Sequence, residues 1–384
     1  FEDPHRLPNI SAYSETCAVL MFITLNHRLF MATGDGKYID VLERGMYNNA
    51  LDGVAASGDR YFYVNRLASA GDGRDLRWAR ASLECCPPNL VRFMASMPGY
   101  VYAQGPEGEV YVNLYVSSEA SFPVGGQELA LSMESEMPWG GRSLITVSSG
   151  GEVQGTLKLR IPGWARNQPV PSDLYFYLKT SDVKPRLQVN GVPLDYKVEN
   201  GFVRIRRKWE KGDAIALELP MPIRRVLSHE KVEENTGRVA LERGPLVYCA
   251  EWVDNNGYVS HIVLHDDASL APQFRENLIN GVVRLHGKAA AFKYETDGKA
   301  PILAKHGFTA IPYYAWAHRG QGEMTVWLAR DESKARFLPQ PTIASTSKVS
   351  ASGDKDGRVI QDQWDPADSG DRTKPYLHWL SLIH

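Results

Sequence analysis

Two adjacent cysteines, Cys85 and Cys86, stand in the stretch ECCPPN of a chain that has only four cysteines. A third, Cys17, follows Glu15 in the E-x-C pattern of SETCA. Three thiols and one carboxylate make a suitable tetrahedral zinc set, because zinc accepts sulfur and oxygen ligands. The spacing is not that of a zinc finger, which pairs its cysteines as C-x-x-C. The residue types therefore leave three interpretations open: a zinc site, inert buried thiols and a redox pair.

Other catalytic motifs are missing from the sequence. The 10 histidines are scattered, and none belongs to H-E-x-x-H or another metal-binding pattern. The G-D-G stretches are not set in a phosphate-binding loop, and the absence of G-x-S-x-G removes support for a serine hydrolase. Cys249 lies in the apolar run LVYCAEW and is predicted to be a small buried hydrophobic residue.

The stretch RYFYVNRL combines aromatic and polar side chains around Tyr63. Aromatic rings next to an amide suit the faces and hydroxyl groups of a sugar. The alternative, which the residues on their own favour, is a strand or loop packed on the core. The tryptophans among the later strand-like runs are predicted to be buried rather than to bind sugar.

Composition and charge exclude several classes of partner. The chain has 384 residues with 43 basic and 45 acidic side chains, a formal net charge of −2. Because this balance gives no strong overall field, neither nucleic acid nor an anionic membrane is an expected partner. No apolar run approaches the roughly 18 residues of a membrane span. The start, FEDPHRLPN, has neither the basic nor the apolar region of a signal peptide and lacks an initiator Met, so the localisation stays open.

The hydrophobic pattern changes near residue 100. Before it, apolar residues recur at helical spacing, and Pro87-Pro88 fits the first turn of a later helix. The residues of the first helical pattern are Ala18, Met21, Phe22, Leu25 and Leu29. After it, alternating runs such as EVYVNLYVSS and FVRIRRKW are broken by Gly, Pro, Asn and Asp, which predicts short strands in two β-sandwiches.

These changes divide the chain into four predicted parts. They are a helical part over 1–103, a first β-sandwich over 104–221, a second over 222–332, and a linker with the start of a further β-sandwich over 333–384. The few helices of the first part do not make a closed domain. We therefore expect this part to be the end of a larger helical domain.

The chain resembles glycoside hydrolase family 127, the β-L-arabinofuranosidases, in an ordered set of stretches: LPNISAYSETCA, YFYVN, ECCPPNLVRF, LERGPLVYCAE and FTAIPYYAWAHRGQGEMTVW. The resemblance covers roughly residues 1–330. It implies a multidomain α + β protein, in which C-terminal helices of an (α/α)6 barrel are followed by two jelly-roll-like β-sandwich domains. The tail from Pro341 resembles the opening of a discoidin-like, sugar-binding β-sandwich.

The resemblance also implies a site. Family members hold a zinc ion with one Glu and three Cys, and the residues that match their motifs are Glu15, Cys17, Cys85 and Cys86. Cys85, the first cysteine of the pair, takes the role of the nucleophile, and Tyr63 aligns with a tyrosine of the sugar pocket. The general acid/base glutamate is expected just before Phe1, together with most of the barrel.

The function that the resemblance implies is a retaining exo-glycosidase that removes terminal β-L-arabinofuranose from plant glycans or glycopeptides. Zinc would keep Cys85 ready to attack, because a zinc-bound thiol is deprotonated. The alternatives are a related pectin-pentose hydrolase of the same family and a catalytically silent carbohydrate-binding protein with a structural zinc. The expected partners are the arabinofuranosyl glycan and the missing N-terminal barrel segment, and the sandwich surfaces could carry a homodimer contact.

Overall fold

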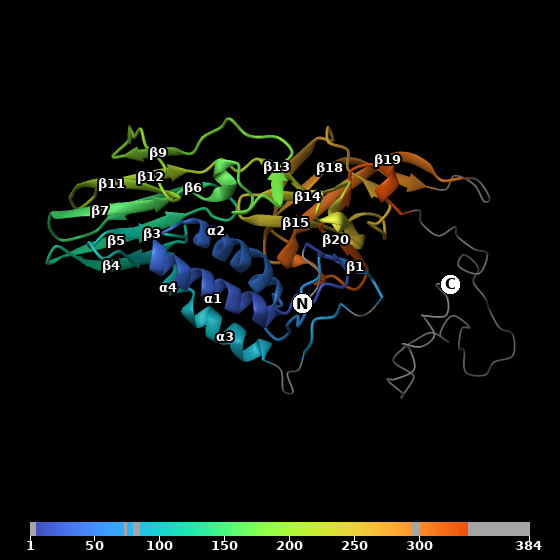
Figure 1. Cartoon of the computed structure of the whole chain (residues 1–384), viewed down its shortest axis with the longest axis horizontal. Coiled ribbons are helices and arrows are strands. Elements are labelled where there is room, and N and C mark those ends of the chain that lie inside the picture. Colours follow the sequence, from blue (N-terminus) through green and yellow to red (C-terminus); the bar gives the residue numbers. More distant parts are fainter. Residues whose placement is uncertain (1–4, 73–74, 80–84, 294–299, 337–384) are drawn as a thin grey trace. The chain divides into compact units, whose positions relative to one another are not determined.

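The computed structural model describes residues 5–72, 75–79, 85–293 and 300–336 (Figure 1). Of the linker and further module predicted over 333–384, everything from position 337 onward lies outside the described residues. In the described part, the α-helices fall within the first hundred or so residues, and nearly all strands follow them. The change from helical to strand-like hydrophobic pattern is therefore confirmed.

The α-helices of the described residues pack together in the N-terminal part of the chain. They are α1 (Thr16–Thr33), α2 (Lys37–Arg44), α3 (Cys86–Ser96) and α4 (Pro98–Val101). A π-helical turn, Gly45–Ala50, continues α2. α1 ends where Gly34 adopts a left-handed φ of 67°, a conformation that favours glycine. α1 contacts both α2 and α3, and Figure 1 shows these helices side by side.

One side of α1 is buried, and the apolar residues on its other side are exposed. Its buried residues include Leu20, Ile23 and Phe30, and its exposed residues include Met21, Phe22 and Leu25. The helix is apolar on more than one side, and by length and hydropathy alone it meets the criteria for a membrane span. A core helix passes the same criteria, and the buried side of α1 packs on α2 as in a core helix.

Two sheets share one hydrophobic core in the middle of the chain. Their strands are β2 (Tyr102–Gln104), β3 (Val110–Val112), β4 (Ser118–Val124), β5 (Gln127–Ser135), β6 (Arg142–Val147), β7 (Val153–Arg160), β9 (Arg186–Val189), β10 (Val192–Pro193), β11 (Phe202–Trp209) and β12 (Ala214–Glu218). One sheet has the order β10-β9-β12-β6-β5-β4 and the other β11-β7-β3-β2. Leu129 and Ile145 of the first sheet and Leu157 of the second are fully buried in this core. The alternation of buried and more exposed residues along β6 and β12 matches the period of a half-buried strand.

A third, larger sheet contains the C-terminal strands. β1 (Ala68–Ala70) and β8 (Tyr175–Tyr177), from earlier in the chain, also belong to it. The C-terminal strands are β13 (Ile223–Ser228), β14 (Arg238–Arg243), β15 (Leu246–Glu251), β16 (Ile262–Val263), β17 (Leu270–Arg275), β18 (Val282–Lys293), β19 (Ile302–Pro312), β20 (Glu323–Thr325) and β21 (Leu328–Ala329). The order is β1-β20-β15-β19-β18-β16-β21-β14-β13-β8, and β17 pairs with β18. Because β1 pairs antiparallel with β20, the segment that follows Tyr63 is fixed to the C-terminal sheet.

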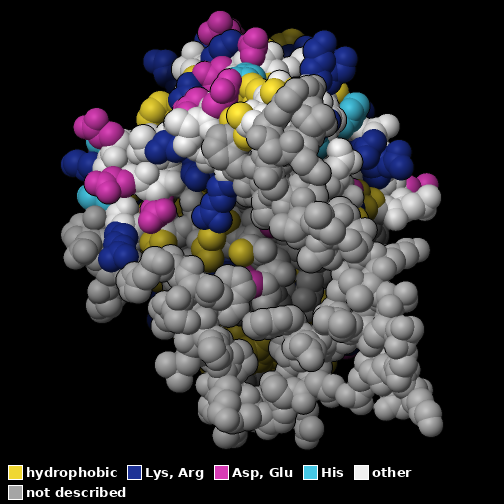
Figure 2. Space-filling model, turned by 90° about the vertical axis from the view of Figure 1, so that its right-hand side faces the viewer, with side chains coloured by type: hydrophobic (Ala, Val, Ile, Leu, Met, Phe, Trp, Pro, Cys, Tyr) yellow, Lys and Arg dark blue, Asp and Glu magenta, His cyan; other side chains and the backbone are white. Residues whose placement is uncertain are grey.

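The described chain is thus a mostly β, multidomain structure with few helices. The (α/α)6 barrel, the jelly-roll topology and the domain boundaries stay predictions. On the face shown in Figure 2, basic and acidic side chains of the described residues are interspersed. This distribution agrees with the nearly balanced charge of the sequence.

Candidate metal and catalytic site

The first turn of α1 carries two of the predicted site residues. Glu15 immediately precedes the helix, and Cys17 lies in its first turn. The start of the helix is held against the segment around Tyr63, because the Thr16 backbone N–H donates to the Tyr63 carbonyl at 2.9 Å. The Thr16 hydroxyl also donates to the Phe62 carbonyl at 2.7 Å. These bonds fix the direction in which Glu15 and Cys17 point.

The start of α3 carries the other two. Cys85 precedes the helix and Cys86 is its first residue, followed by Pro87 and Pro88. Proline suits this turn because the N–H that it lacks would have no partner inside the helix. The N-termini of α1 and α3 both meet at the cluster, and a helix N-terminus favours negative charge on nearby carboxylates and thiolates.

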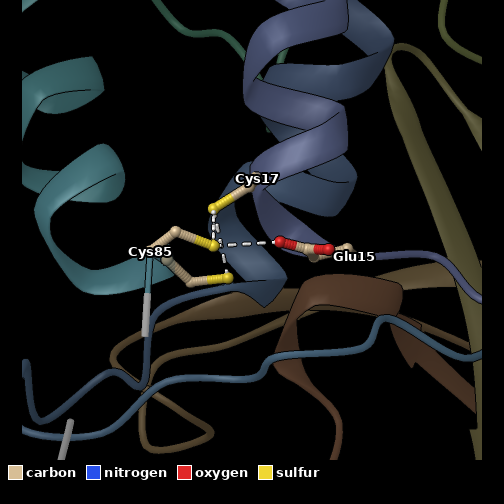
Figure 3. Close-up of side chains that lie close together, drawn as sticks. Glu15, Cys17 and Cys85 are labelled. Atoms are coloured by element: carbon tan, nitrogen blue, oxygen red, sulfur yellow. Dashed lines mark hydrogen bonds between the residues drawn. The ribbon is translucent and has the colours of Figure 1, made fainter. Parts of the chain in front are cut away.

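The four side chains come together at one point. Their donor atoms all lie within 4.8 Å of one another. Cys17 Sγ lies 3.0 Å from Cys85 Sγ and 3.3 Å from Cys86 Sγ. Cys85 Sγ also lies 3.0 Å from Glu15 Oε1. Figure 3 shows Cys85 between Cys17 and Glu15, which come from the start of the neighbouring helix.

Three sulfurs and one carboxylate oxygen fit a tetrahedral cation. With bonds of about 2.0–2.3 Å, such an ion spaces its ligands roughly 3.5–4 Å apart. The four donors, all within 4.8 Å of one another, are close enough for one ion to reach them all, and the contacts of 3.0–3.3 Å to Cys17 and Cys85 would lengthen slightly around it. The Asn89 side-chain amide donates to Cys17 Sγ at 3.2 Å, which favours negative charge on that sulfur. Among the described residues, this is the group whose donor atoms can hold a metal ion, and its thiols suit a soft one.

The cysteines of the cluster differ in burial. Cys17 and Cys86 are buried, whereas Cys85 is exposed. Cys249 lies elsewhere, on β15, and is buried as the sequence predicts. A molecule that approaches the cluster from solvent therefore meets Cys85 first.

Without a cation, the thiols of Cys85 and Cys86 hold their protons more tightly than free cysteine does. Hydrogen bonding to Cys17 and to Glu15 raises the pKa of Cys85 to about 11. Burial raises the pKa of Cys86 well above its ordinary value. The hydrogen bonds from Cys85 and Tyr13 lower the pKa of Glu15. At neutral pH the bare site therefore presents an ionised Glu15 beside neutral Cys85 and Cys86 thiols, and a nucleophilic Cys85 needs a cation beside it.

Two tyrosines extend the cluster toward solvent. The Tyr13 hydroxyl donates to Glu15 Oε2 at 2.8 Å and lies 3.0 Å from the Tyr63 hydroxyl. The structure thus places Tyr63, predicted from the sequence, one hydroxyl away from Glu15. Sequence reasoning missed Tyr13 and Asn89. Their signal was local: Tyr13 stands two residues before Glu15, and Asn89 lies about one helical turn after Cys86.

Comparisons with known proteins match the chain in three consecutive stretches. The model of the β-L-arabinofuranosidase catalytic domain of glycoside hydrolase family 127 matches residues 1–99. The middle-domain model of this family matches residues 109–221. Its C-terminal-domain model matches residues 223–329.

Individual relatives agree with these matches. A non-reducing end β-L-arabinofuranosidase of Bifidobacterium longum subsp. longum is 32% identical over 356 residues, which are 86% of this chain and 51% of the relative. A solved family 127 β-arabinofuranosidase is 42% identical with a TM-score of 0.84, over 88% of this chain and 53% of the other. A solved family 127 β-L-arabinofuranosidase of Geobacillus stearothermophilus is 36% identical with a TM-score of 0.77. The match covers 86% of this chain and 52% of the other.

The chain therefore spans about half the length of the relatives that it matches. The matches follow the chain in order from the helices that carry the cysteine cluster to the C-terminal sheet. Together they show that this chain belongs to glycoside hydrolase family 127.

Proposed function

We propose that the natural protein is a retaining exo-glycosidase that removes terminal β-L-arabinofuranose from plant glycans or glycopeptides, with Cys85 as its nucleophile. One observation carries this proposal: the exposed Cys85 Sγ lies 3.0 Å from both Glu15 Oε1 and Cys17 Sγ within a four-donor cluster. The substrate class is supported by the names of the relatives, which are β-L-arabinofuranosidases.

The metal proposed for the cluster is zinc. Glu15 and the three cysteines of the cluster would hold it. When bound, zinc supplies the positive charge that keeps the Cys85 thiol deprotonated at neutral pH. The buried Cys17 and Cys86 anchor the cluster, and the exposed Cys85 faces the substrate.

The proposed reaction has two displacements at the anomeric carbon. In the first, Cys85 Sγ forms a bond to this carbon while the glycosidic C–O bond breaks, and the leaving oxygen takes a proton from a general acid. In this proposal, that acid is a glutamate expected just before Phe1. In the second, water attacks the same carbon and gives a proton to the same acid, which now acts as a base, while the C–S bond breaks and its electron pair returns to Cys85. Two inversions give net retention, and the anionic side chains of the cluster favour an oxocarbenium-like transition state.

Tyr63 is proposed to orient the sugar. Its hydroxyl lies 3.0 Å from the Tyr13 hydroxyl, which in turn is bonded to Glu15. A hydroxyl so placed can bind a sugar hydroxyl next to the attacked carbon, which holds the reacting atoms in line.

The domain layout is part of the same proposal. Residues 1–103 would complete an (α/α)6 catalytic barrel, and 104–221 and 222–332 would form two jelly-roll-like sandwiches. The shared core of the two middle sheets supports the first sandwich. The matched ranges of the family's middle and C-terminal domain models support the boundary between the two.

The experiment is hydrolysis of a synthetic β-L-arabinofuranoside by the complete natural protein, with and without a zinc chelator. We expect hydrolysis that the chelator abolishes and added zinc restores. Cys85→Ser should lower kcat by at least about a thousandfold while circular dichroism shows a retained fold. Cys249→Ala is the matched control, because Cys249 is a buried thiol remote from the cluster, and it should keep activity.

Three other results would point away from this mechanism. Unchanged activity in Cys85→Ser would end the nucleophile role. Bound zinc with no hydrolysis of arabinofuranosides would favour the pectin-pentose hydrolase. Loss of the fold in Cys85→Ser, with no hydrolysis by the natural protein, would favour a structural zinc in a carbohydrate-binding protein.

A further inference from the structure

Trp78 presents an exposed indole ring next to Tyr63. Among the tryptophans that the structure describes, Trp78 alone is exposed, with 44% of its surface accessible. Its ring stacks on Tyr63 with 5.9 Å between the centroids and 15° between the planes. The Tyr61 ring packs edge-to-face with the Trp78 ring, with 6.0 Å between the centroids and 72° between the planes. A large aromatic surface therefore stays exposed to solvent, although contact between apolar surface and water is unfavourable.

The position of Trp78 is fixed by its backbone. Its N–H donates to the Tyr61 carbonyl at 2.8 Å, and its carbonyl accepts from the Tyr61 N–H at 3.0 Å. The preceding residue, Arg77, is buried and donates to Asp52 Oδ1 at 3.1 Å and to the Trp316 carbonyl at 3.2 Å. Because these bonds hold the backbone, the exposed ring loses little conformational entropy when it binds a ligand, and this favours affinity.

Trp78 is connected to the cluster through Tyr63. One face of the Tyr63 ring stacks on Trp78, and its hydroxyl meets Tyr13, which donates to Glu15. Starting from the cluster, these contacts reach Tyr63 first and Trp78 next. An aromatic face suits the C–H face of a sugar, because the ring presents a flat apolar surface.

We propose that Trp78 is the stacking platform for the sugar unit on the leaving-group side of the cleaved bond, and so determines how strongly the enzyme prefers a glycan over a simple arabinofuranoside. This inference rests on the proposed function, since it assigns a subsite next to the Cys85 cluster. Tyr63 binds the sugar that is cleaved, and Trp78 binds the sugar that leaves.

The test compares two substrates of the complete natural protein. One is an arabinofuranosyl disaccharide, and the other is methyl β-L-arabinofuranoside, whose leaving group has no ring to stack. Trp78→Ala should lower kcat/KM about tenfold for the disaccharide and leave the methyl glycoside within about twofold. Trp78→Phe should retain most of the disaccharide activity, whereas Trp78→Leu, apolar but not aromatic, should behave like Trp78→Ala. Phe176→Ala is the control, because Phe176 is 47% exposed and lies on β8, away from the cluster.

An equal loss on both substrates would overturn the proposal, because Trp78 would then only support Tyr63. No loss on either would overturn it too. Calorimetric binding of the disaccharide to the Cys85→Ser protein separates this inference from the proposed function. Tenfold weaker binding in the Trp78→Ala variant would uphold the platform even if the wild type cleaved no arabinofuranoside, and equal binding would refute it. If the wild type neither cleaves nor binds the disaccharide, both proposals are wrong.

Discussion

The guanidinium of Arg160, at the end of β7, donates to the carboxylate of Glu43 on α2, and both side chains are buried. Trp164 Nε1 donates to the other Glu43 oxygen at 2.9 Å. Arg160 Nη1 also donates to Asp40 at 2.6 Å. Since α1 packs on α2, this ion-pair cluster fixes the helix that carries Cys17 to the middle sheets.

The first prediction concerns this buried pair. Arg160→Met leaves the Glu43 carboxylate buried without its cation, which should lower the free energy of unfolding by about 3–5 kcal/mol. Urea unfolding measured by tryptophan fluorescence reports this change. Glu43→Gln added to Arg160→Met should recover part of the loss, because the second change removes the unpaired charge.

The control for this prediction is the exposed pair of Arg186 and Glu218, whose side chains are 74% and 56% accessible. Arg186→Met should cost less than about 1 kcal/mol, since exposed ion pairs contribute little. If the Arg160→Met protein is as stable as the Arg186→Met protein, the buried pair does not hold α2 to the middle sheets.

The second prediction concerns the metal content of the cluster. Cys86→Ser should lose bound zinc, because it removes a buried sulfur that lies 3.3 Å from Cys17 Sγ. Mass spectrometry of the native protein and elemental analysis report the metal. Cys249→Ala, which changes a buried thiol on β15, should retain the metal content of the natural protein. Zinc retained by Cys86→Ser would remove Cys86 from the ligand set.

The third prediction concerns Tyr13, which holds the outer oxygen of Glu15. Tyr13→Phe removes the 2.8 Å hydrogen bond to Glu15 and the contact with the Tyr63 hydroxyl. Such supporting bonds orient metal ligands, so zinc affinity should fall about 10- to 100-fold while the ligand set stays intact. Titration against a competing chelator measures the affinity. Tyr258→Phe, at an exposed tyrosine outside the site, should leave the zinc affinity unchanged. Equal zinc affinities in the two variants would contradict the role of Tyr13 in orienting Glu15.

The fourth prediction concerns stability at mildly acidic pH. His261 is 3% exposed, and its ring lies 5.4 Å from that of His306. Burial, with a smaller effect of His306, lowers the pKa of His261 from 6.5 to about 4. As the pH falls from 6.5 toward 4, the unfolded chain takes up a proton that the folded one does not. His261 therefore destabilises the fold in this window, by on the order of 3 kcal/mol, and has no such effect above it.

Unfolding free energies measured between pH 4 and 7 test this, because this range covers the window between the folded pKa of about 4 and the unfolded pKa of 6.5. His261→Gln should flatten the pH dependence, because the variant has no group to protonate at this position. His265→Gln, at an exposed histidine, should leave the dependence as in the natural protein. Identical slopes for both variants would show that another group is responsible for the acid sensitivity.

The helices could be predicted from the sequence, but their buried faces could not. The spacing around α1 predicts a helix, and Gly34 ends it as expected. The apolar residues that predict the helix include Met21 and Phe22, yet these are exposed, whereas Ile23, which is not part of that pattern, is buried. A helix that is apolar on more than one side does not reveal which side packs on a partner, because that depends on residues far away in the sequence.

The cysteine cluster shows a similar limit. From the residues alone, zinc, inert thiols and redox chemistry all remained open, and only the family resemblance chose among them. The structure brings the four side chains together, but the ligand roles stay predictions. Trp78 was missed because a single exposed tryptophan has no periodic signal. What holds it in place, such as the bond from Arg77 to the Trp316 carbonyl, joins residues 239 positions apart.

The unequal burial of the cysteines has a practical consequence for labelling. Cys85 is exposed, whereas Cys17, Cys86 and Cys249 are buried. An electrophilic reagent shaped like the sugar would therefore react with the folded chain at one thiol, that of Cys85. A fluorescent tag on this reagent would count working molecules in a crude extract. A molecule labelled at Cys85 alone is a folded one, because only the folded chain buries the other three thiols.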